Sequence, residues 1–226
     1  MEDLLYTISI WILPALTAIT LHEAAHGYAA EMFGDNTARR MGRVSLNPLR
    51  HVDPFGTIIL PGILLFARAP FLFGYAKPVP VDFAGLDNPR RDMVFVAAAG
   101  PLMNVVLALL AAFLYHGLDL VPAAAAAWVA ENLKNAIELN VILAVFNMLP
   151  IPPLDGGRVA VGILPDRLAF PLARLERVGI LIVLGILFVL PMLGNVIGLN
   201  LNTSTWLIGI PAQALYQIII TVAGHG

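Results

Sequence analysis

The sequence contains no cysteine, so disulfide bonds are excluded and any metal site must take its ligands from His, Asp and Glu. Charge is also scarce. Charged residues make up 12% of the 226 residues, roughly half the share found in soluble domains. The net charge of −2 gives no reason to expect a nucleic acid as partner. With 59% hydrophobic residues and a mean hydropathy of +0.83, the composition indicates a protein embedded in the lipid bilayer.

Long apolar runs separated by short polar stretches predict an all-α polytopic membrane protein with about five transmembrane helices. The expected spans cover roughly residues 4–33, 93–115, 123–149, 178–193 and 206–222. The stretch 57–73 begins with an apolar run that is too short to cross and is interrupted at Pro61-Gly62, so we expect a re-entrant or interfacial segment there. Prolines within residues 75–82 favour an extended chain after it.

The basic residues orient these spans. Twelve of the thirteen Lys and Arg residues fall in the stretches 34–53, 68–91 and 158–177, while the connections 116–131 and 195–205 have none. By the positive-inside rule, the basic stretches are cytoplasmic. We therefore expect a multi-pass protein of the cell (plasma) membrane, with its N-terminus outside and its C-terminus cytoplasmic.

The pair His22 and His26 is the strongest chemical signal in the chain. On a helix these residues lie about 40° apart around the axis and about 6 Å apart along it, so both imidazoles can bind one metal ion. Glu23 lies between them on the adjoining flank, which completes the His-Glu-x-x-His pattern of two zinc ligands and a general base. The preceding residues are almost wholly apolar, and ionisable groups inside a membrane span are usually functional.

A catalytic zinc site usually has a third protein ligand, and Asp155 is our candidate. The third span ends at Pro150, Pro152 and Pro153, which cannot continue a helix, so the chain should unwind there. Asp155 follows directly and is next to two glycines that allow close approach. We therefore predict one Zn²⁺ per chain, held by His22, His26 and Asp155 towards the cytoplasmic side.

Together these motifs resemble the site-2 protease family of intramembrane zinc metalloproteases. The resemblance lies in His22-Glu23-Ala24-Ala25-His26, Gly100-Pro101-Leu102-Met103-Asn104 and Asn147-x-x-Pro150-x-Pro152-x-Leu154-Asp155-Gly156. Gly42-Arg43-Val44-Ser45-Leu46-Asn47-Pro48 and Asp53-Pro54-Phe55-Gly56 are similar to its compact branch, which has no PDZ or CBS domain. We expect residues 1–226 to form one transmembrane metalloprotease domain, with a core at 4–157 and accessory spans within 176–223.

The resemblance implies a zinc-dependent endopeptidase that cuts membrane-protein substrates within or near a transmembrane helix. Glu23 would be the general base, and Asn147 and Asn104 are candidate donors to the oxyanion. The segment from Tyr75 to Val81, or the edge near 43–46, could bind an unwound substrate by strand addition.

Two other classes of protein remain open. An inactive relative that binds zinc and sequesters membrane helices is disfavoured by the intact Glu23. A metal transporter should spread its ligands along a route through several spans. The remaining histidines are expected to lie outside the site: His51 at the surface of a polar loop, His116 at the outer end of the second span and His225 in the C-terminal tail.

Overall fold

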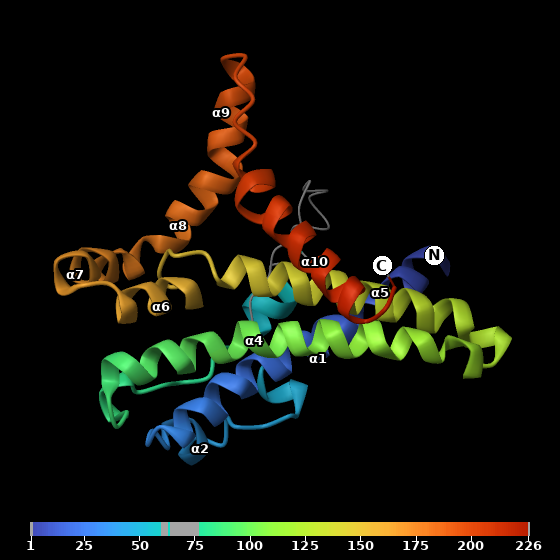
Figure 1. The fold of residues 1–226 in the computed structure, drawn as a ribbon, viewed down its shortest axis with the longest axis horizontal. Helices are drawn as coiled ribbons and strands as arrows, with labels where there is room; N and C mark the ends of the chain where they lie inside the picture. Colours follow the sequence, from blue (N-terminus) through green and yellow to red (C-terminus); the bar gives the residue numbers. More distant parts are fainter. Residues whose placement is uncertain (1, 60–62, 64–76, 226) are drawn as a thin grey trace.

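The computed structural model describes residues 2–59, 63 and 77–225, and all regular structure within them is helical (Figure 1). The α-helices are α1 (Glu2–Met32), α2 (Thr37–Arg40), α4 (Pro89–Tyr115), α5 (Ala123–Asn147), α6 (Asp155–Ile163), α7 (Asp166–Arg174), α8 (Gly179–Leu184), α9 (Leu190–Val196) and α10 (Ile210–Val222). Short 3₁₀ or π turns are η1 (Pro48–Arg50), η2 (Pro54–Ile59), η3 (Phe83–Gly85), η4 (His116–Leu120), η5 (Leu175–Arg177), η6 (Gly185–Val189) and η7 (Thr205–Gly209).

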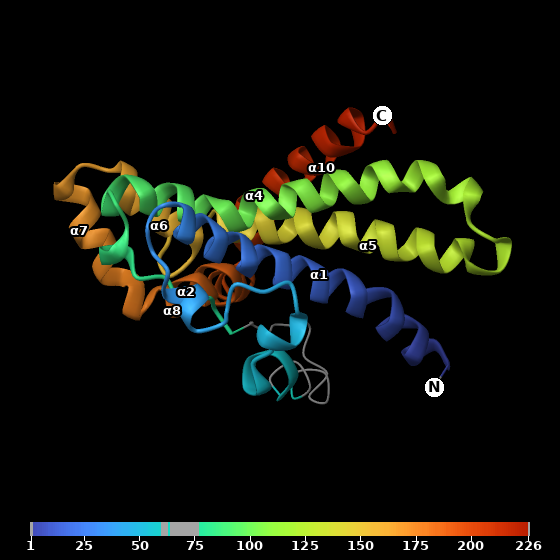
Figure 2. The same cartoon turned by 90° about the horizontal axis from the view of Figure 1, so that it is seen from below.

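Helices α1, α4 and α5 lie side by side and form the centre of the molecule (Figures 1 and 2). α4 packs against both neighbours, and small residues at its interface with α5 and α10 allow the helix backbones to approach closely. Buried amides add polar contacts between helices; for example, the Asn135 side chain donates to the Ile10 carbonyl at 3.0 Å. This packing brings the histidine-bearing face of α1 against α4.

Within the described part of the chain, three helical segments are long and apolar enough to cross a membrane: Leu5–Met32, Pro89–Leu120 and Thr205–Val222. A fourth would be the pair Asp166–Arg177 and Gly179–Gly194, which is bent by 86°. α5, our third predicted span, is long enough but contains Glu131, Lys134 and Glu138. The chain is thus a multi-pass helical membrane protein, but the predicted number of five spans is not confirmed.

The polar loop after α2 is more compact than the sequence suggested. We expected His51 at the surface, and this prediction is wrong, because the side chain is only 2% exposed. Its Nε2–H donates to the Ser45 carbonyl at 2.8 Å, which folds the loop over the ring. Most of the predicted re-entrant stretch 57–73 lies outside the described residues. Residues 77–82, the described part of the predicted extended segment, form neither helix nor regular strand.

The C-terminus lies at the same end of the helix bundle as the N-terminus. The His225 ring stacks on His116 at the end of α4, with ring centroids 3.9 Å apart, and its Nε2–H donates to the Ala112 carbonyl at 2.9 Å. Figures 1 and 2 show both termini towards the end of the bundle where α4 leads into α5. The predicted orientation, with the N-terminus outside and the C-terminus cytoplasmic, is not confirmed by this arrangement.

Candidate metal centre and active site

The two histidines of α1 point together into the helix bundle. His22 is 8% exposed and His26 is 9% exposed, and their rings meet edge to face with centroids 4.7 Å apart. One helical turn separates them, as the spacing predicted, and the unbroken helix keeps both on the face that packs against α4.

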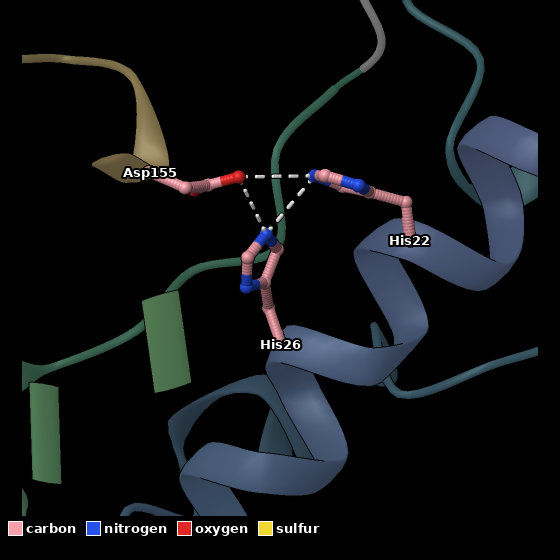
Figure 3. A group of neighbouring side chains, drawn as sticks. All are labelled: His22, His26 and Asp155. Carbon is pink, nitrogen blue, oxygen red and sulfur yellow. Dashed lines mark hydrogen bonds and ion pairs between the residues drawn. The ribbon is translucent and has the colours of Figure 1, made fainter. Parts of the chain in front are cut away.

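Asp155 completes a triangle with these histidines (Figure 3). Its Oδ2 lies 3.2 Å from the Nε2 of His22 and 3.4 Å from the Nε2 of His26, and the two Nε2 atoms are 3.1 Å apart. Ligands at zinc's usual 2.0–2.1 Å stand roughly 3.3 Å apart in a regular tetrahedron. The three donors therefore fit one face of a zinc tetrahedron and leave its fourth corner free.

The position of Asp155 follows from the end of α5. That helix stops at Asn147, the proline-rich turn follows, and α6 begins at Asp155 itself. Burial raises the pKa of this carboxyl, but hydrogen bonds and positive charge that the two imidazoles supply when they are protonated outweigh burial and hold the pKa well below its ordinary range. The ionised carboxylate is the form that binds a metal ion.

Neighbouring groups on α4 fix the tautomer of both imidazoles. The Nδ1–H of His26 donates to the Val96 carbonyl at 2.7 Å, and the Nδ1 of His22 lies 2.6 Å from the Oδ1 of Asn104. With Nδ1 protonated in both rings, each Nε2 keeps its lone pair for a metal ion.

Asn104 belongs to a buried chain of amides that the sequence did not lead us to expect. Its Nδ2 donates to the Oδ1 of Asn140 at 2.8 Å, and Asn140 in turn donates to the Ala136 carbonyl at 2.8 Å. Neither asparagine is more than 1% exposed. Asn140 lies two helical turns before Asn147, on the same side of α5. This spacing of two asparagines on one face of an apolar helix is the sequence signal that could have identified Asn140 as part of a buried polar network.

Glu23 and Asn147 are not members of the donor triangle, and each makes a hydrogen bond of its own. The Oε2 of Glu23 accepts a hydrogen bond from the backbone N–H of Val79 at 2.8 Å, so a segment far along the chain reaches this carboxylate. Asn147 is half-buried, and its Nδ2 donates to the Leu143 carbonyl one turn earlier at 3.0 Å.

Helix α4 comes unusually close to the histidines at Gly100. A Cβ added there would lie 2.6 Å from the Nε2 of His22 and would also meet the Nε2 of His26. Only glycine lets the α4 backbone pass this near the donor atoms, so the Gly-x-x-x-Asn element contributes both this close approach and Asn104.

Comparisons with known proteins agree with this geometry. The sequence profile of "Peptidase family M50" matches residues 10–122 and 118–190. The chain is 37% identical over 196 residues to "Putative zinc metalloprotease YwhC" of Bacillus subtilis, covering 84% of this chain and 85% of that protein. It is 31% and 32% identical to "Putative zinc metalloprotease Rip2" of Mycolicibacterium smegmatis and Mycobacterium tuberculosis, in each case over 62% of this chain.

The matches to the two Rip2 proteins span about half of their length, 52% in each case. No solved structure matches the chain significantly. The family profile covers most of the sequence, including every residue of the metal-binding triangle. The chain therefore belongs to peptidase family M50, the site-2 protease family that its motifs resemble.

Proposed function

We propose that the chain is a zinc-dependent intramembrane endopeptidase in which His22, His26 and Asp155 hold one Zn²⁺. Family membership and the names of the relatives, each of which begins "Putative zinc metalloprotease", support this function. The observation that carries the assignment of the ligands is the donor triangle, with edges of 3.1, 3.2 and 3.4 Å. Its buried position and the fixed tautomers of both histidines suit a metal that needs neutral imidazole and carboxylate ligands.

When bound there, zinc would act as a Lewis acid and lower the pKa of a water molecule towards neutrality. Glu23 would accept the proton of that water and later pass it to the departing amine. Its side chain points about 100° away from His22 around the helix, so it can face a water molecule without binding the metal. The Val79 N–H uses one of its oxygens and leaves the other for the proton.

The two asparagines receive different roles. Asn104 uses its amide protons within the buried network and its oxygen on His22, so we propose that it orients this ligand instead of donating to the oxyanion. Asn147 has a second amide proton and a half-buried position near the ligand turn, and we retain it as the proposed oxyanion donor.

The substrate in this proposal is a membrane protein cut within or near a transmembrane helix. We propose that α5 crosses the membrane with α1, α4 and α10, because it packs along α1 and α4 over its length. Both termini would then lie outside the plasma membrane, and the zinc ligands would lie in its cytoplasmic half, near the basic loops. Residues 1–226 would form one domain, with the core at 4–157 and accessory helices within 176–223.

The variant Glu23→Gln tests the proposed function. It keeps the size of the side chain and an acceptor for Val79, but it loses the base. We expect at least a 10²-fold loss of cleavage of a single-span reporter helix in liposomes, with wild-type zinc content. Glu131→Gln is the matched control, since this exposed glutamate of α5 lies outside the site. Equal cleavage by wild type and Glu23→Gln would exclude Glu23 as the base.

Neither rival class has a structural observation in its favour. A transporter needs ligands along a path, whereas the described part of the chain contains a single candidate metal cluster. An inactive scaffold would bind the reporter helix in the same liposomes without cutting it.

A further inference from the structure

The hydrogen bond between Val79 and Glu23 is one of several bonds that tie residues 77–87 alongside the end of α1. Lys77 N–H donates to the His51 carbonyl at 2.9 Å, and Asp87 N–H donates to the Phe33 carbonyl at 2.9 Å. Of the hydrogen bonds made by residues 77–87, only the one from the Val79 N–H reaches a residue of the proposed active site, Glu23. The position of the Glu23 carboxylate therefore depends on where this segment lies.

Arg43 holds that segment in place. Its Nη2 donates to the carbonyls of Lys77 at 2.7 Å and Pro78 at 3.3 Å, and its Nη1 donates to the carbonyl of Arg50. One planar guanidinium thus joins the 43–51 loop to the two residues that immediately precede Val79. Lysine could not replace this fork, because it offers a single nitrogen on a flexible chain.

The 43–51 loop and residues 77–79, which Arg43 joins, both pack against α1 at Gly27. This glycine lies one turn beyond Glu23 on the same face of the helix. A Cβ at Gly27 would lie 3.1 Å from a methyl group of Val44 and 3.2 Å from a methyl group of Val79. Val44 of the loop and Val79 of the second segment therefore both pack against the helix that carries the Glu23 carboxylate. The absent side chain at Gly27 allows Val79 to come within hydrogen-bonding distance of Glu23.

We propose that Arg43 is a positioning residue for Glu23, acting through the backbone of residues 77–79. The guanidinium binds the carbonyls of Lys77 and Pro78, these residues fix the N–H of Val79, and that N–H orients the carboxylate. Arg43 does not bind substrate in this proposal, because both its Nη atoms already donate to backbone carbonyls. The inference rests on the proposed function, since it assigns Arg43 a role through the proposed base.

The test compares Arg43→Gln, Arg43→Lys and the control Arg40→Gln, which replaces an exposed arginine of the same stretch. We expect Arg43→Gln to lower kcat 10- to 100-fold, the usual effect of losing a group that orients a site residue. KM should stay within about twofold, with unchanged zinc content and melting temperature. Arg43→Lys should show a smaller loss, and Arg40→Gln should cleave like the wild type.

A second variant removes the link itself. Val79→Pro deletes the N–H that donates to Glu23 and should reproduce the loss in kcat. If the Arg43 variants fail to fold, this variant decides the question; a kcat within twofold of wild type in Val79→Pro would overturn the proposal.

Hydrogen exchange at the Val79 amide gives a readout that does not need activity. It should be slow in the wild type and in Arg40→Gln, and at least tenfold faster in Arg43→Gln. Unchanged exchange, or a kcat within twofold of wild type, would overturn the role of Arg43. A wild type that cuts no reporter would instead remove the proposed function, while the exchange rates would still decide whether Arg43 holds the segment.

Discussion

Replacing Gly100 with alanine should remove zinc from the protein while leaving the fold in place. The added Cβ would lie 2.6 Å from the Nε2 of His22, about 0.8 Å short of an ordinary contact. Coordination distances in real metal sites vary by only about 0.2 Å, so an imidazole displaced this far no longer binds the ion well. We expect zinc affinity to fall at least 100-fold, which corresponds to about 2.8 kcal/mol.

The loss of stability should be smaller than the loss of zinc binding. Overpacking a tight site costs about 1–3 kcal/mol, and alanine returns roughly 0.5–1 kcal/mol over glycine within a helix. The assay is a competition titration of zinc against a chelator of known affinity, with melting temperatures measured on the zinc-free protein.

Gly185→Ala is the matched control, because a Cβ there meets nothing within 4 Å. It should bind zinc like the wild type. Wild-type zinc affinity in Gly100→Ala would show that the histidines do not bind the metal in the observed geometry, and the proposed site would be refuted.

Three other predictions concern the surroundings of the site. Asn140→Leu should lower zinc affinity about 10- to 100-fold in the same titration, because Asn104 loses its acceptor and no longer orients its histidine. In the cysteine-free chain, a cysteine appended to the C-terminus should be labelled from the same side of the membrane as Leu120→Cys and from the opposite side to Ser45→Cys. If the C-terminal cysteine were instead labelled from the same side as Ser45→Cys, the topology predicted from the arginines would hold. The pKa of Asp35 is lowered, since two backbone amides and nearby groups outweigh its burial, so its contribution to stability should be constant above about pH 4 and fade in stronger acid, as thermal unfolding at several pH values would show.

The proximity of the proposed metal ligands could be predicted from the sequence because local geometry decides it. A spacing of four residues on any helix brings two imidazoles together, and this rule does not depend on the rest of the fold. Asp155 needed one further step, since three prolines and two glycines indicated where α5 must unwind. In both cases the residue types themselves determine the local backbone.

The contacts around these residues could not be predicted, because they join segments that only the fold brings together. Nothing near Glu23 in the sequence points to Val79, which is 56 residues away, and nothing near His51 indicates that a loop covers it. From the sequence, Asn104 was a candidate donor to the oxyanion. Its hydrogen bond to Asn140 could not be foreseen, because that contact depends on how α4 and α5 are aligned. The side of the membrane on which the C-terminus lies also depends on such contacts, since basic residues orient loops and say little about a connection that has none.

The helices described as accessory have a structural role in the metal site. Leu149 and Leu154, on either side of the proline-rich turn, are buried against Val183 and Leu187 of α8 and η6. The turn has few backbone hydrogen bonds of its own, such as that from the Leu154 N–H to the Ile151 carbonyl at 3.0 Å, so this packing helps to fix the segment that presents Asp155. The proposed zinc site therefore depends on the chain beyond its last motif: α1 offers two of the proposed ligands through local geometry, whereas helices that follow the third help to hold it in place.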